Sequence, residues 1–193
     1  MFFTLSVVKK PHVARISFAF LIFLVAGGSF AADPRIQDLT AVSSGGKVTI
    51  HFTLADAFLS ADMVQSLQSG LPTSVSYEAE VYRDRPNWFD EMVGRSRIEV
   101  ICTFNSVTRE YLLNYRRDRK LVRSETFSDL AALQRAMTSI EERDLFDIGS
   151  RRPYKMKVRV RADLMRSWRF YVVPWEVTTR WRDTRVQCPE CKP

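Results

Sequence analysis

The chain is poor in the residues on which most enzyme chemistry and metal binding depend. Only two histidines, three cysteines, seven glycines and eight prolines occur among 193 residues. Few glycines and prolines, together with 46% apolar residues, exclude collagen-like and wholly disordered chains. A zinc site takes about four ligands, and a nucleophilic triad needs a histidine base. We therefore predict a packed globular domain with no catalytic residue, no metal site and no cofactor.

Residues 1–31 have the order of a secretory signal peptide. Three basic residues precede a short apolar run at residues 16–26, and small residues follow it. This run falls short of the ~20 residues that span a bilayer. We predict cleavage after Ala31, with Ser29 at the −3 position, and hence a periplasmic or secreted protein. The alternative is an uncleaved N-terminal segment that anchors the protein to the membrane.

Part of the positive charge lies in this leader. The chain has 29 Lys and Arg and 22 Asp and Glu, a net charge of +7. Three of the basic residues and none of the acidic ones fall in residues 1–31, so 26 remain against 22, a net charge of +4. Export and this modest charge both argue against a nucleic-acid partner. A cell-envelope protein or an anionic membrane surface is the expected partner.

Alternation of apolar and polar residues predicts a chain built mainly of strands. The expected strands are residues 35–42, 47–54, 73–83, 97–105, 110–116, 120–126, 154–164 and 172–182. A turn is expected at residues 43–46, and a loop with an aromatic anchor, Trp88, at residues 84–90. Strands with one polar face are typical of antiparallel sheets.

Two stretches change to a helical period. Residues 55–69 are expected to form a helix that Gly70 ends, and a second helix is expected from an N-cap at Ser128 to about Glu142. We therefore predict one domain over residues 32–186, an antiparallel β-sandwich with two short helices, for which an immunoglobulin-like topology is one option. Its expected core includes Val100, Phe104, Leu133, Met137, Val158 and Val160.

A row of basic residues is the leading candidate for a binding site. The row and the arginines that precede it are Lys155, Lys157, Arg159, Arg161, Arg151 and Arg152. The apolar residues between them fix the register, so the charges project from one wet face. Acids such as Glu78, Glu80 or Glu99 on a neighbouring strand would cancel the row by cross-strand pairing. Otherwise the row is a surface for phospholipid head groups, an acidic glycan or an acidic protein.

Other polar residues give weaker indications. Glu78 and Glu80 share one strand face at a spacing of about 6.6–7 Å, which overlaps that of inverting glycosidases but also occurs in any exposed strand. His51 is expected on a wet strand face. Neither feature predicts catalysis.

Two of the three cysteines form a lone CxxC near the end of the chain. Cys188 and Cys191 are a candidate local disulfide in a tail formed by residues 187–193. Inert thiols, a metal or intermolecular contact and redox work are the alternatives. Cys102 lies in an apolar strand and is expected to be a buried free thiol.

Several segments together resemble a known family. They are residues 67–72, the strand that follows to Glu80, residues 82–85, residues 111–115, residues 127–137, residues 154–164, and the closing Trp175 and Trp181. Over nearly the whole chain after residue 31 they resemble the exported bacterial proteins grouped as domain-of-unknown-function family 4390. The resemblance implies no activity and no catalytic residue. It implies an envelope partner, because genes of this family often neighbour that of a membrane sensor kinase.

These observations predict a non-catalytic binding or adaptor domain of the cell envelope. The alternative is a hydrolase that acts on a cell-envelope polymer. A flat basic or aromatic surface would favour the first, and a concave pocket with convergent titratable groups would favour the second.

Overall fold

The computed structural model describes residues 33–59, 61–150, 153–169 and 173–189 of the chain. Contacts divide the chain into Met1–Ala31 and Ala32–Pro193, and the second unit contains every element described below. Over the described residues, no helix combines the length and the apolar content that crossing a membrane requires.

Ten strands and two α-helices make up the described part. The strands are β1 (Arg35–Ser44), β2 (Lys47–Ala55), β3 (Thr73–Arg83), β4 (Glu91–Asn105), β5 (Glu110–Arg117), β6 (Lys120–Phe127), β7 (Ser139–Asp147), β8 (Met156–Arg169), β9 (Val173–Thr178) and β10 (Arg182–Arg185). The helices are α2 (Ala61–Gln68) and α3 (Leu130–Thr138), with a 3-10 turn, η2 (Pro153–Lys155), before β8.

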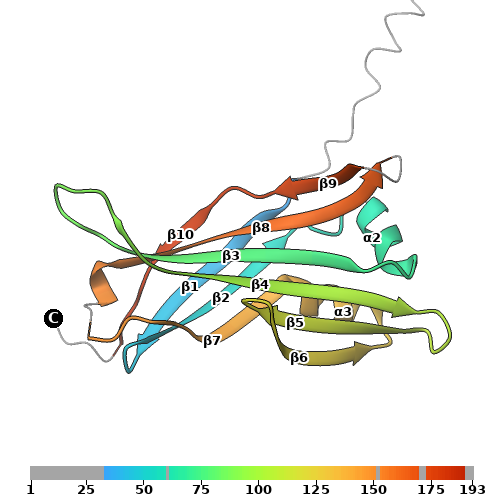
Figure 1. Ribbon diagram of the computed structural model, residues 1–193, viewed down its shortest axis with the longest axis horizontal. Coiled ribbons are helices and arrows are strands. Elements are labelled where there is room, and N and C mark those ends of the chain that lie inside the picture. Colours follow the sequence, from blue (N-terminus) through green and yellow to red (C-terminus); the bar gives the residue numbers. More distant parts are fainter. Residues whose placement is uncertain (1–32, 60, 151–152, 170–172, 190–193) are drawn as a thin grey trace, which may run out of the picture. The chain divides into compact units, whose positions relative to one another are not determined.

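The strands form two antiparallel sheets (Figure 1). The small sheet has the order β1-β2-β7, and the large sheet has the order β10-β8-β3-β4-β5-β6, with β9 also paired to β8. The mainly β, antiparallel, sandwich-like fold with two helices is thus confirmed. The strand order differs from the four-plus-three arrangement of immunoglobulin domains, because β3 to β6 form a simple meander.

Short turns set the first hairpin as expected. Gly45 and Gly46 connect β1 to β2 with φ of 57° and 77°, a left-handed conformation that glycine adopts without strain. At Gly46 a side chain would also meet the backbone oxygen of Gly149 at 2.7 Å. The first helix is shorter than predicted, since β2 continues to Ala55 and α2 begins only at Ala61.

The prediction of one helix over residues 128–142 is wrong at both ends. Asp129, not Ser128, is the N-cap, and its Oδ2 accepts a hydrogen bond from the Ala132 amide at 2.8 Å. The chain then turns directly into β7 at Ser139, where it pairs with the open edge of β2. Pairing across the small sheet overrides the helical composition of residues 139–142.

The last two predicted strands also differ from expectation. Residues 153–155 form η2, so Lys155 precedes the strand instead of lying within it. Where one strand was expected at residues 172–182, β9 ends at Thr178 and a separate strand, β10, begins only at Arg182. Both pair with β8: β10 with its first part and β9 with its last part.

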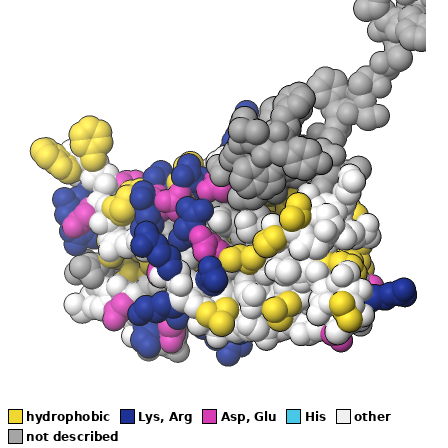
Figure 2. Space-filling model, turned by 45° about the vertical axis from the view of Figure 1, so that its right-hand side comes forward, with side chains coloured by type: hydrophobic (Ala, Val, Ile, Leu, Met, Phe, Trp, Pro, Cys, Tyr) yellow, Lys and Arg dark blue, Asp and Glu magenta, His cyan; other side chains and the backbone are white. Residues whose placement is uncertain are grey.

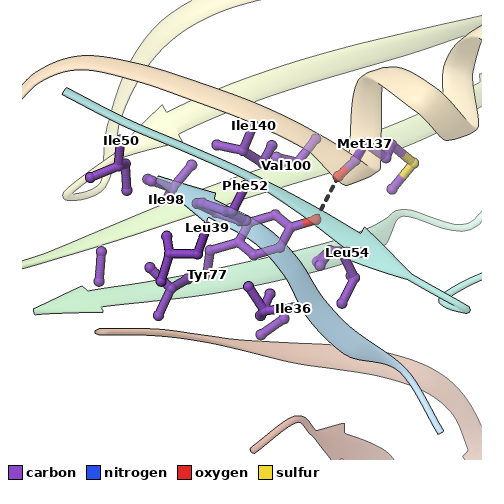
Figure 3. Packing of buried hydrophobic residues seen from close by; sticks show 14 of the residues in the cluster. Ile36, Leu39, Ile50, Phe52, Leu54, Tyr77, Ile98, Val100, Met137 and Ile140 are labelled. Atoms are coloured by element: carbon purple, nitrogen blue, oxygen red, sulfur yellow. Dashed lines mark hydrogen bonds between the residues drawn. The ribbon is translucent and has the colours of Figure 1, made fainter. Parts of the chain in front are cut away.

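The core lies between the two sheets and under α3. The ring of Tyr77 packs edge-on against Phe52 with centroids 5.1 Å apart, so a residue of the large sheet meets one of the small sheet (Figure 3). The Tyr77 hydroxyl donates to the Met137 carbonyl at 2.6 Å, at the C-terminal end of α3. Of the six expected core residues, five are buried and Phe104 is partly buried.

Backbone hydrogen bonds join the segment that follows β10 to β1 of the small sheet. The Gln187 amide donates to the Ala41 carbonyl at 2.9 Å, and the Gln187 carbonyl accepts from the Ser43 amide at 2.7 Å. Val42 and Gln187 thus form a parallel bridge. Ordered pairing therefore extends past residue 186, into the first residue of the predicted tail.

Candidate functional site

The register of β3 against β8 decides what the basic row faces. Glu78 lies opposite Arg161, Glu80 opposite Arg159, and Tyr82 opposite Lys157. The acidic strand is therefore the direct neighbour of the basic one. Figure 2 shows the consequence, since Lys and Arg side chains intermingle with Asp and Glu on the face it presents.

Glu80 is fully buried although it points away from the core. Arg159 Nε donates to its Oε2 at 2.6 Å, Tyr82 Oη donates to the same oxygen at 2.9 Å, and Arg95 Nε donates to Oε1 at 2.8 Å. Burial acts to raise the pKa of Glu80, but the hydrogen bonds from Arg159, Tyr82 and Arg95 outweigh it and lower that pKa. The carboxylate is held ionised, which suits a structural anchor and not a proton donor.

Glu78 forms the second rung of this ladder. Arg161 Nε donates to Glu78 Oε2 at 2.9 Å, and Arg95 Nε lies 3.2 Å from Oε1. Arg95 therefore bridges the two carboxylates, and both are occupied by guanidinium groups. This occupancy argues against an acid–base pair made of Glu78 and Glu80.

Two aromatic rings cover the ladder. The guanidinium carbon of Arg159 lies 4.5 Å from the centroid of Tyr82 and 4.4 Å from that of Trp181. Arg161 approaches the same Trp181 ring at 4.7 Å. Cation–π contacts of this kind are worth about 0.5–2 kcal/mol. Trp181 therefore helps to hold both arginines in place over the two glutamates.

Lys157 is held less tightly than the arginines beside it. Its Nζ lies 3.8 Å from Asp84 Oδ2 and 3.7 Å from Asp90 Oδ2, distances of ion pairs without a direct hydrogen bond. Lys157 also lies on the wall of a pocket of about 330 Å³. The residues that line this pocket are Tyr82, Asp90, Lys157, Arg159, Trp181 and Asp183.

The pocket brings both signs of charge and two rings together. Asp183 of β10 lies opposite Arg159 in the register but forms no ion pair with any described residue. Lys157 is the loosely paired cation and Asp183 the unpaired acid. The pocket therefore provides one place for a negative group and one for a positive group.

The β3–β4 hairpin continues from this pocket into an aromatic tip. The hairpin extends beyond the neighbouring strands (Figure 1), and Trp88 and Phe89 at its end are 74% and 88% exposed. Hydrophobic side chains project at the corresponding upper left edge of Figure 2. Asp90, which follows Phe89 directly, lines the pocket. The tip and the pocket are therefore parts of one surface.

Ion pairs stiffen the base of the tip. Arg83 and Arg85 both donate to Oε2 of Glu91. Partial desolvation acts to raise the pKa of Glu91, but the hydrogen bond from Arg85 and the charge of Arg83 lower it. The Asp84 amide donates to the Lys155 carbonyl at 2.7 Å and ties the hairpin to η2. The aromatic pair is thus presented on a braced support.

The remaining predicted site residues take no part in the pocket or lie outside the described residues. Lys155 is exposed, while Arg151 and Arg152 lie outside the described residues. Glu99 pairs within β4, with Arg97 Nε at 3.2 Å, and not with the basic row. Binding of an anionic partner by the row stays a prediction.

Among the described residues, the cysteines and the histidine take no part in the pocket. Cys102 is free and buried, as predicted. Cys188 is disulfide-bonded, but Cys191 lies outside the described residues, so their pairing stays a prediction. His51 is half-buried on β2 and faces Glu141 of β7.

The sequence interpretation missed the role of the hairpin tip and of Asp183. Trp88 was expected as an anchor, which implies burial, but it is exposed. The adjacent pair Trp88 and Phe89, placed after Pro86 and Asn87 and between charged residues, was the signal available in the sequence. Asp183 could not be found that way, because its position depends on the division of the last strand.

Comparison with known proteins gives one match. The family model described as Domain of unknown function (DUF4390) matches residues 31–182, which include β1 to β9 and the start of β10. No curated protein matches the chain, and no solved structure does.

Proposed function

The chain belongs to the DUF4390 family, whose description names no activity, and we propose from its geometry that it is a non-catalytic binding or adaptor domain of the cell envelope. The observation that carries the proposal is the pair Trp88 and Phe89, 74% and 88% exposed at the end of a braced hairpin. Exposed aromatic residues that adjoin a pocket are typical of contact surfaces for a partner.

The charges beside the tip support binding better than chemistry. Glu80 and Glu78 are held by arginines, which leaves them as parts of the scaffold. Among the described residues that line the pocket, Lys157 has only long ion pairs and Asp183 has none, so both can pair with charges of a partner. Such a surface recognises a partner by aromatic burial and by charge pairs of both signs.

An envelope location is part of the proposal. It rests on the basic, apolar and small-residue order of residues 1–31, which is that of an export signal. N-terminal sequencing of the protein from the envelope fraction tests it, and a chain that starts at Ala32 is the expected result. A chain that keeps residues 1–31 in its final form would favour the anchored alternative.

The binding role is tested by purification of the exported protein from the envelope fraction. We expect one or more envelope components to co-purify with the unaltered protein and to be lost from a variant with Trp88→Ala and Phe89→Ala. Val107→Ala is the matched control, since Val107 is an 89% exposed apolar residue in the turn after β4. Equal recovery of the same components with a folded tip variant would contradict the proposed surface.

A further inference from the structure

We propose that the hairpin tip and the adjoining pocket dock onto a phospholipid surface whose head groups are zwitterionic, with a phosphate and an amine. This inference rests on the proposed binding function and names the chemistry of its partner. The surface consists of the aromatic pair Trp88 and Phe89 and the pocket walls that carry Lys157 and Asp183.

The aromatic pair fits the boundary between lipid and water. Tryptophan favours the head-group region of a bilayer, where its apolar ring and its polar N–H both find suitable surroundings. Trp88 and Phe89 are neighbours at one narrow end, so both rings can enter the boundary while the rest of the hairpin stays outside. Met92, 46% exposed on the β4 side of the hairpin, adds apolar surface close to them.

The charges of the hairpin disfavour a strongly anionic membrane. From residue 83 to residue 91 it carries Arg83 and Arg85 against Asp84, Asp90 and Glu91. Both arginines are engaged by Glu91, and the two aspartates face Lys157. An anionic surface would meet at least as much negative as positive charge here, so electrostatic attraction is not the driving force.

The pocket supplies partners for both halves of a zwitterionic head group. Lys157, whose ion pairs are 3.7 and 3.8 Å long, has donors for a phosphate oxygen. Asp183, which lines the same pocket and has no ion pair among the described residues, suits a positive amine. Asp90 lines the pocket and directly follows Phe89 in the chain. A lipid whose head group lies in the pocket can therefore also be in contact with the aromatic tip.

Vesicle binding by the exported protein tests the inference. The probes are vesicles of phosphatidylcholine and phosphatidylethanolamine, with and without added phosphatidylglycerol. Binding is measured by flotation of the vesicles and by the change in tryptophan emission. We expect binding to the zwitterionic vesicles, little gain from phosphatidylglycerol and weak dependence on salt. Trp88→Ala with Phe89→Ala should weaken binding about tenfold or more, and Val107→Ala should not.

The pocket has its own variants. Lys157→Gln and Asp183→Asn should each weaken vesicle binding about three- to tenfold without loss of folding, because neither residue is buried. Arg97→Gln is the control, as Arg97 is an exposed arginine of the same sheet whose Nε donates to Glu99; its backbone amide, which donates to Asp118, is kept in the variant. Equal vesicle binding by the pocket variants and the control would overturn the head-group part of the inference.

Two further outcomes separate this inference from the proposed function. Binding only to vesicles with phosphatidylglycerol, abolished by salt and indifferent to the tip variant, would overturn it in favour of attraction by the basic row. An absence of vesicle binding, while a protein still co-purifies from the envelope in a tip-dependent way, would also overturn it. In that second case the binding function would stand, with a protein as the partner.

Discussion

Arg159 of β8 lies directly opposite Glu80 of β3, and its Nε donates to the buried carboxylate at 2.6 Å. The acid is fully buried on the outer face of a sheet because Tyr82, Arg95 and Arg159 close over it. A hydrogen-bonded buried charge is stable only while its partners remain. The outer face of the large sheet therefore contributes to the stability of the domain.

Removal of Arg159 should destabilise the domain. We expect Arg159→Ala to lower the free energy of unfolding by about 1–3 kcal/mol, because Glu80 loses a charged donor but keeps Arg95 and Tyr82. Lys157→Ala, in the same row, should cost only about 0–1 kcal/mol, since its ion pairs are long and partly exposed. Urea denaturation monitored by circular dichroism measures the free energy of unfolding of both variants. Equal losses of stability would contradict the view that Arg159 is a structural residue and Lys157 a weakly paired one.

Glu80 should also make the stability depend on pH. Its pKa is lowered in the folded state, so its contribution is present above the usual value near 4.5 and is lost as the pH falls through the folded value. Unfolding curves below pH 5 should thus show a loss of stability that is smaller in Glu80→Gln. If the stability of Glu80→Gln falls with pH as steeply as that of the unaltered protein, other carboxylates are responsible for the acid sensitivity.

Period-two patterns in the sequence were sufficient to predict most strands of the large sheet, but not the order in which they pair. Val75, Tyr77 and Val81 face the core as their alternation required, and the pairing of the basic row with Glu78 and Glu80 was one of two stated outcomes. Strand register could not be predicted, because it depends on how distant segments align. The choice between paired row and open row therefore needed the structure.

The misplaced end of α3 has a similar cause. Residues 139–142 carry two glutamates and continue the apolar spacing of Met137 with Ile140, so local composition favours helix. The edge of β2 supplies backbone partners that a longer helix would leave unpaired, and β7 fills it. The hairpin tip was missed for another reason, since a sequence pattern does not separate an aromatic residue that anchors a loop from one that projects into solvent.

Two tyrosines hold adjacent carbonyls at the end of α3, which allows a matched comparison. The Tyr77 hydroxyl donates to the Met137 carbonyl at 2.6 Å in a buried contact, and the Tyr115 hydroxyl donates to the Ala136 carbonyl at 3.0 Å in a contact that is only partly buried. We expect Tyr77→Phe to cost about 1–3 kcal/mol, because the carbonyl is left unsatisfied without access to water. Tyr115→Phe should cost less, and thermal or urea unfolding of the two variants gives the comparison. A larger cost for Tyr115→Phe would contradict the assignment of the tighter contact to Tyr77.

The core can be probed with two apolar residues that differ in burial. Leu133 of α3 is fully buried, and Leu133→Ala should cost about 2–5 kcal/mol through lost contacts and the cavity left behind. Phe104 of β4 is only partly buried and stacks against Tyr111 with centroids 4.7 Å apart. Phe104→Ala should therefore fall at or below the lower end of the ~3–5 kcal/mol that a fully buried phenylalanine costs. Denaturation midpoints unchanged by both substitutions would show that neither side chain belongs to the core.

Cys102 should be inert to thiol reagents until the domain unfolds. The side chain is buried on β4, and burial raises the pKa of its thiol from 9.0 to about 11. The thiolate is the reactive form, so at pH 8 both its low population and its lack of access slow the reaction. We expect Cys102 to react with a disulfide reagent at the rate of unfolding, and to react at once in denaturant.

Because the folded pKa of Cys102 lies above the unfolded one, this thiol also contributes stability that is present below about pH 9 and lost as the pH rises toward 11. Cys102→Ser should remove that alkaline loss, and rapid labelling of the native protein at Cys102 would contradict its buried position.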